Sequence, residues 1–69
     1  MAITLKAARV NKSLTRQAVK ALLLEIYNID ISVNTLANYE KEGGTQPDIE
    51  TGKALAAIYG RSVDEINFF

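Results

Sequence analysis

The sequence contains neither cysteine nor histidine. Without cysteine there is no disulfide and no thiolate metal site, so apolar packing alone has to stabilise the fold. This absence also suits a reducing environment, and we expect a cytoplasmic protein. The sequence shows no phosphate-binding loop motif and no pair of acids at an evident catalytic spacing. We therefore expect no enzyme, no metal site, no other cofactor and no small-molecule ligand.

Long apolar runs are also missing. Lys6, Arg9 and Lys12 interrupt the first apolar residues. Every apolar run is far shorter than the ~20 residues that span a bilayer. We therefore expect no signal peptide and no membrane partner. A length of 69 residues has room for one domain, residues 1–69, with one modest core.

Acidic residues are missing from the first third of the chain, although the net charge of the whole chain is zero. Residues 1–24 carry only basic charges, at Lys6, Arg9, Lys12, Arg16 and Lys20. A nucleic-acid backbone responds to the local field, so this third could dock on phosphates. The plainer interpretation is that these side chains cover the solvated outer faces of two helices. Charge alone slightly favours the plainer interpretation.

Apolar residues recur at helical spacing along most of the chain, which predicts a compact all-α fold of five helices. The expected helices are residues 2–12, roughly 16–27, about 32–42, the stretch from Asp48 to Gly60, and a short one that begins after Ser62. Residues 27–31 are expected to form a connection. The core candidates on the third and fourth helices are Leu36, Tyr39, Leu55 and Ile58.

Polar residues and glycines mark where these helices begin and end. Thr15 and Ser32 are suitable N-caps, and Gly43-Gly44 suits the end of the third helix. Ser62 and Glu65 have the spacing of a capping box. Val63, Ile66 and Phe69 would pack the fifth helix against the rest.

Four segments of the chain resemble one known family, in the right order and at nearly the usual spacing. They are residues 14–17, 31–40, 45–51 and 62–66, of which the second, ISVNTLANYE, is the most specific. On these segments the chain resembles the phage-like lambda-repressor and Cro-type (Xre) family of helix-turn-helix DNA-binding proteins. The resemblance covers nearly the whole chain. It implies a five-helix lambda-repressor-like domain with a helix-turn-helix motif at about 15–42.

The sequence departs from this family in two places. The connection through Leu24–Asp30 is several residues longer than the family's usual turn between helices two and three. Lys20 stands where the family typically has a small alanine packed against helix three. We expect a longer second helix and an altered angle between the two helices of the motif.

The resemblance implies that the third helix enters the major groove of double-stranded DNA. Carried over position by position, it assigns base contacts to Val33, Asn34 and Asn38. An asparagine can bond an adenine edge through two hydrogen bonds, and a valine can contact a thymine methyl group. The plainer alternative is that both asparagines are ordinary solvated helix residues.

Contacts with the DNA backbone are implied for residues that flank the third helix. This set consists of Arg16, Gln17, Ser32, Thr35, Lys41, Thr45 and Gln46. Such contacts set register and orientation without recognising sequence. For Thr45 and Gln46, loop solubility is an equally good explanation.

Arg9 and Glu40 match an arginine and a glutamate that commonly pair in the resembling family. The resemblance implies that this ion pair locks the third helix against the first. We favour this structural role over direct contact of Arg9 with DNA.

Two functions remain open at this point. The first is a small Cro-like transcriptional regulator that binds operator DNA as a homodimer. The second is an antirepressor or other protein-interaction module that binds a repressor protein in a heteromer. Its possible partner surface consists of Tyr27, Ile29, Phe68 and Phe69. The two phenylalanines could instead fold back over the first helix.

Overall fold

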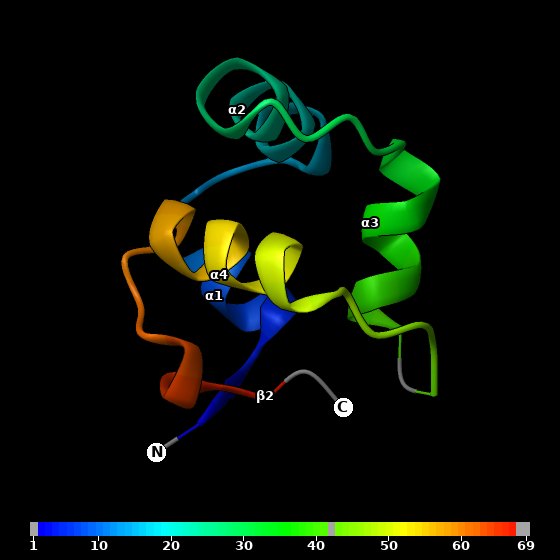
Figure 1. Cartoon of the computed structure of the whole chain (residues 1–69). Coiled ribbons are helices and arrows are strands. Elements are labelled where there is room, and N and C mark those ends of the chain that lie inside the picture. The colour runs from blue at the N-terminus through cyan, green and yellow to red at the C-terminus, as the bar shows by residue number, and fades with distance from the viewer. Residues whose placement is uncertain (1, 42, 68–69) are drawn as a thin grey trace.

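The computed structural model describes residues 2–41 and 43–67. Within these ranges the chain forms four α-helices, one turn of 3-10 helix and two short strands (Figure 1). The helices are α1 (Leu5–Asn11), α2 (Arg16–Tyr27), α3 (Val33–Glu40) and α4 (Ile49–Ile58). The remaining elements are β1 (Ile3–Thr4), η1 (Val63–Glu65) and β2 (Ile66–Asn67). None of the described helices is long and apolar enough to cross a membrane.

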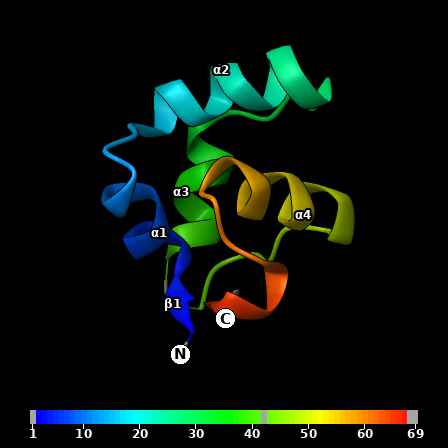
Figure 2. The ribbon, with the colours of Figure 1, turned by 90° about the vertical axis from the view of Figure 1, so that its left-hand side faces the viewer.

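The four helices surround one apolar core. Figure 2 shows α2 across one end of the molecule and β1 and η1 at the other, with α4 between them. The buried apolar residues are Leu5, Ala8, Val19, Leu23, Leu36, Ala54, Leu55, Ala56, Tyr59 and Ile66. Leu36 and Leu55 were predicted for the core, and both are buried. Tyr39 and Ile58 are partly buried and pack against it.

Each helix begins at a polar N-cap, because the first backbone N–H groups of a helix have no partner inside it. The side-chain oxygen of the cap accepts a hydrogen bond from the N–H three residues later, over 2.9–3.1 Å. The four caps are Thr4, Thr15, Ser32 and Asp48. The predicted caps Thr15 and Ser32 are thereby confirmed.

The expected fifth α-helix is absent from the described residues, and the first helix begins later than predicted. Residues 63–65 form a single 3-10 turn, and Ile66–Asn67 then pair in parallel with Ile3–Thr4. The capping-box bond from the Ser62 N–H to Glu65 Oε1 is present at 3.0 Å, but it opens only this one turn. The first helix starts at Leu5 because Thr4 is its extended N-cap. β-Branched residues favour strands, which suits Ile3 and Ile66. The contact expected from Phe69 lies outside the described residues.

The segment between α2 and α3 is irregular, as predicted for residues 28–31, although Tyr27, which was also expected in the connection, is the last residue of α2. Helix α2 ends at Tyr27, and Asn28 follows in the left-handed conformation with φ 56°. Asparagine tolerates this conformation better than most residues. The Ile29 N–H then donates to the Leu23 carbonyl at 3.0 Å. Ile29 and Ile31 pack against the core and hold the segment down. That it is longer than usual in the family stays a prediction.

Candidate nucleic-acid interface

The predicted base-contacting residues lie on α3, at one side of the molecule in Figure 1. Asn34 and Asn38 are exposed and stand four residues apart, so they share one face of the helix. Leu36 is buried and anchors the inner face. Val33, the first residue of α3, is partly exposed. The helix therefore presents two amide side chains to solvent while its opposite face is fixed in the core.

Ser32 and Thr35, both predicted to contact the DNA backbone, are hydrogen-bonded to each other at the start of α3. The Ser32 hydroxyl accepts from the Thr35 N–H at 3.1 Å and lies 2.9 Å from the Thr35 hydroxyl. These contacts fix the position of the helix N-terminus. Ser32 is exposed and Thr35 is partly exposed. Because a hydroxyl can donate one hydrogen bond while it accepts others, both side chains can still bond a further group.

The loop that follows α3 folds back onto the last turn of that helix. Helix α3 ends at Glu40, earlier than the predicted 42, because Lys41 is extended with ψ 135°. The Lys41 N–H donates to the Asn38 carbonyl at 3.3 Å, and the Gly44 N–H donates to the Lys41 carbonyl at 2.9 Å. Lys41, Thr45 and Gln46 are all exposed along this loop. They therefore continue the exposed polar surface of α3.

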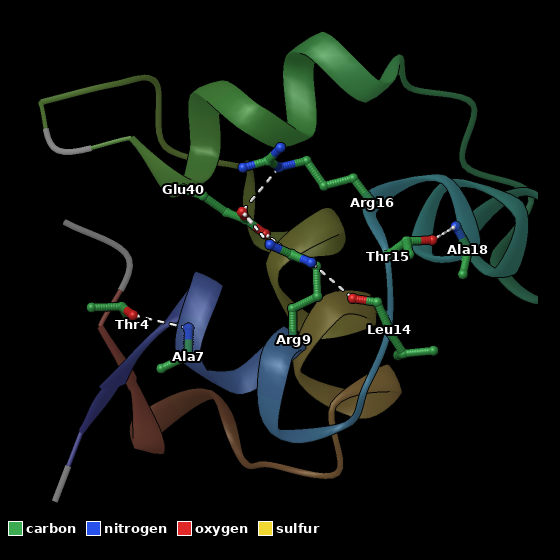
Figure 3. Close-up of polar contacts among 8 residues, drawn as sticks. All are labelled: Thr4, Ala7, Arg9, Leu14, Thr15, Arg16, Ala18 and Glu40. Atoms are coloured by element: carbon green, nitrogen blue, oxygen red, sulfur yellow. Dashed lines mark hydrogen bonds and ion pairs between the residues drawn. The ribbon is translucent and has the colours of Figure 1, made fainter.

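The structure brings Arg9, Glu40 and Arg16 together between α1, α2 and α3 (Figure 3). Arg9 forms a bidentate pair with Glu40, through Nε to Oε2 at 2.7 Å and Nη2 to Oε1 at 3.3 Å. Its Nη1 donates to the Leu14 carbonyl at 2.8 Å. Arg16 Nε donates to Glu40 Oε1 at 3.1 Å. One carboxylate thus connects three helices.

Burial differs sharply within this cluster. The side chain of Glu40 is only 5% exposed and that of Arg9 12%, whereas that of Arg16 is 37% exposed. Two guanidinium groups share one carboxylate, so the cluster keeps one uncompensated positive charge. Gln17, next to Arg16 at the start of α2, is also exposed. The Arg16–Glu40 contact was not predicted, because the two residues are 24 positions apart and meet only in the folded chain.

Two tyrosines lie close to the charged groups around α3. Tyr59 is buried in the core, and this burial, reinforced by the negative charge of Glu40 and opposed by Arg9, raises its pKa to about 12. Burial and the charge of Asp48 raise the pKa of Tyr39 above its usual value. Both phenols therefore stay neutral near pH 7.

Of the surface predicted to bind a protein partner, only Tyr27 is exposed among the described residues. Tyr27 is exposed at the end of α2, whereas Ile29 packs against the core. Leu24 and Ile26, on the same helix, are exposed as well, Ile26 by 61%. Phe68 and Phe69 lie outside the described residues.

A second apolar surface, which the sequence did not indicate, lies where α4 begins. A cavity of about 250 Å³ opens there between the start of α4 and η1. Ile49 and Val63 line it, and Ile49 is 79% exposed. Gln46, at the end of the loop after α3, lines the same cavity. The sequence signal that could have indicated this surface is Ile49. It directly follows the N-cap Asp48, a position that is not expected to face the core, so a large apolar side chain there is unusual.

A family model for helix-turn-helix proteins of the Xre and lambda-repressor type matches residues 5–66, nearly the whole chain. The chain belongs to this helix-turn-helix family. The resemblance inferred from sequence is confirmed, and the protein is of the class of DNA-binding transcription regulators. No curated protein and no solved structure matches the chain.

Proposed function

We propose that the protein is a small Cro-like regulator that binds operator DNA with α3 in the major groove. The observation that carries the proposal is the exposed pair Asn34 and Asn38 on the outer face of a helix whose inner face is buried. The helix-turn-helix motif would occupy about residues 15–42. The regulator would act in the cytoplasm and need no cofactor.

The chemistry of α3 suits recognition of base edges. An asparagine amide donates and accepts at once, which matches the N7 and N6 groups of adenine. Val33 supplies an apolar surface for a thymine methyl group. Each correct pairing contributes roughly 1–3 kcal/mol of discrimination against a wrong base.

Polar groups around α3 would set its orientation by binding the sugar–phosphate backbone. At the start of the motif these are Arg16 and Gln17, and at the start of α3 they are Ser32 and Thr35. At the other end they are Lys41, Thr45 and Gln46. All seven are exposed or partly exposed, which supports this assignment.

The proposed regulator binds as a homodimer. Two-fold symmetry would appear in the operator as a palindrome whose half-sites lie about one helical turn apart. The apolar cavity beside Ile49 and Val63 supports association, since exposed apolar surface of this kind is typical of protein contacts. Dimer formation would be visible as an increase in mass with concentration in sedimentation equilibrium.

The test is a selection of bound duplexes from a random DNA library at two salt concentrations. We expect a recovered palindrome and an affinity that falls steeply as salt rises, because binding releases counterions from phosphates. Asn34→Ala should lower affinity about tenfold or more for that site and relax its specificity. The matched control is Asn11→Ala, which removes an exposed asparagine at the end of α1. Retention without any enriched sequence would refute operator recognition.

A second candidate function is an interaction module that binds a repressor protein. The exposed apolar side chains of Leu24, Ile26 and Tyr27 on α2 favour it. Its test is calorimetric titration of a repressor from the same genome into the protein. Ile26→Glu should abolish binding if this surface is used, and Val10→Glu, at a similarly exposed apolar position on α1, should not. Equal effects of both substitutions would exclude the α2 surface.

A further inference from the structure

Within the described residues, the Arg16 side chain is bound to the protein through one nitrogen. Its Nε donates to Glu40 at 3.1 Å, and no hydrogen bond within the described residues engages either Nη group. Arg9, by contrast, uses Nε, Nη1 and Nη2, and it is nearly enclosed. The two arginines of the cluster therefore differ in their hydrogen bonding as well as in burial.

We propose that Glu40 is a positioning residue, which holds the Arg16 guanidinium so that its two Nη groups can bind one backbone phosphate of DNA. This inference rests on the proposed function, because it assumes that α2 and α3 face DNA. Glu40 itself, which is 5% exposed, touches no DNA in this arrangement.

The charges of the cluster permit this role. A carboxylate beside an arginine usually competes with a phosphate for the same cation. Here the bidentate pair with Arg9 already compensates the Glu40 charge, so the positive charge of Arg16 stays available. Since Arg16 is the more exposed of the two arginines, the uncompensated charge of the cluster lies at the surface.

Only arginine has the geometry for this arrangement. Its planar guanidinium can donate from Nε to one acceptor while the two Nη groups face another. A lysine at position 16 would keep the charge, but its ammonium group lacks the planar fork that bonds Glu40 through one nitrogen and presents two parallel N–H groups to a phosphate. A guanidinium fixed before DNA arrives also loses less side-chain freedom on binding, which raises affinity.

The alternative is that Glu40 only supports the fold. A double-mutant cycle on DNA affinity separates the two roles, using Glu40→Gln and Arg16→Ala with the duplex from the library selection. We expect Arg16→Ala to weaken binding about tenfold and to lower the salt slope by about one. Glu40→Gln should weaken binding severalfold when Arg16 is present and less than about twofold when position 16 is alanine. Equal losses in both backgrounds would overturn the inference.

Two further measurements do not depend on the folding of the Glu40 variant. Arg16→Lys keeps the charge and the fold, and we expect it to lose most of the affinity that Arg16→Ala loses. Full affinity in this variant would mean that charge alone suffices, and the positioning role would fail. In the DNA-free protein, NMR should show an Arg16 Nε–H protected from exchange, and a rapidly exchanging one would also contradict the proposal.

These outcomes separate this inference from the proposed function. A wild-type protein that retains no duplex at either salt concentration overturns the proposed function, and the phosphate contact of Arg16 with it. A wild-type protein that binds its duplex while the cycle shows no coupling overturns only the role of Glu40.

Discussion

Gly44, in the loop directly after α3, tolerates no side chain. A Cβ added there would lie 2.0 Å from the Asn38 carbonyl oxygen and 3.0 Å from the Lys41 carbonyl oxygen. Both neighbours are backbone atoms and cannot rotate away. Because non-bonded heavy atoms normally approach to only about 3.5 Å, Gly44→Ala has to shift the loop by roughly 1 Å or more.

That shift would break two hydrogen bonds, from the Gly44 N–H to Lys41 and from the Lys41 N–H to Asn38. At about 1 kcal/mol net for each bond, plus residual strain, we expect Gly44→Ala to destabilise the protein by about 2–4 kcal/mol. The matched control is Gly43→Ala. Its Cβ meets nothing within 4 Å, and its φ of 75° alone should cost about 1 kcal/mol.

Urea unfolding of both variants, followed by circular dichroism, gives this difference from the midpoints at constant slope. We expect the Gly44→Ala midpoint to lie well below that of Gly43→Ala. If the two variants differ by less than about 0.5 kcal/mol, the loop is not held against α3 as described, and the reasoning fails.

Three further predictions concern the charged and titrating groups. Glu40→Leu alone should lower the free energy of unfolding, measured in urea, by about 2–4 kcal/mol, because it leaves Arg9 partly buried without its carboxylate. The double variant Arg9→Met with Glu40→Leu should lose less stability, and a larger loss would contradict this. Hydrogen bonds from Thr51 hold the pKa of Asp48 below its usual value of 3.8, so the stabilisation it contributes is present above that value and is lost as pH falls through the lower folded pKa. Thermal melts of Asp48→Asn should therefore depend less on acid pH, and an unchanged acid profile would refute the contribution. The pKa of Tyr59 is raised from 10.0 to about 12, so the stability that its phenol contributes is full below pH 10 and is lost as pH rises toward 12. In an absorbance titration of tyrosinate, Tyr59→Phe should lack the step at the highest pH, and persistence of that step would assign it to another tyrosine.

Local signals carried most of what the sequence predicted correctly. Thr15 and Ser32 cap helices because their side chains bond a backbone N–H three residues away, which depends on nothing distant. The end of α2 at Tyr27 was predicted because the apolar stripe of that helix stops there. Periodicity likewise placed Leu36 and Leu55 in the core.

Among contacts between distant residues, the sequence indicated only the Arg9–Glu40 pair, through the family resemblance, and the others were missed. Residues 62–66 have good helix-start spacing, yet the strand that follows pairs with Ile3–Thr4, at the other end of the chain. This parallel pairing ends the helix after one turn. The contact of Arg16 with Glu40 is of the same kind, because it needs α2 and α3 to be already in place.

The most direct test of the proposed function is to map the DNA-binding surface by NMR. Amide shifts of the labelled protein would be followed while the selected duplex is added, with a scrambled duplex as control. The proposal predicts that the largest specific shifts occur at Val33, Asn34 and Asn38 of α3, with weaker ones near Arg16 that both duplexes produce. Shifts confined to the exposed end of α2 around Ile26, or none with either duplex, would contradict DNA recognition by α3.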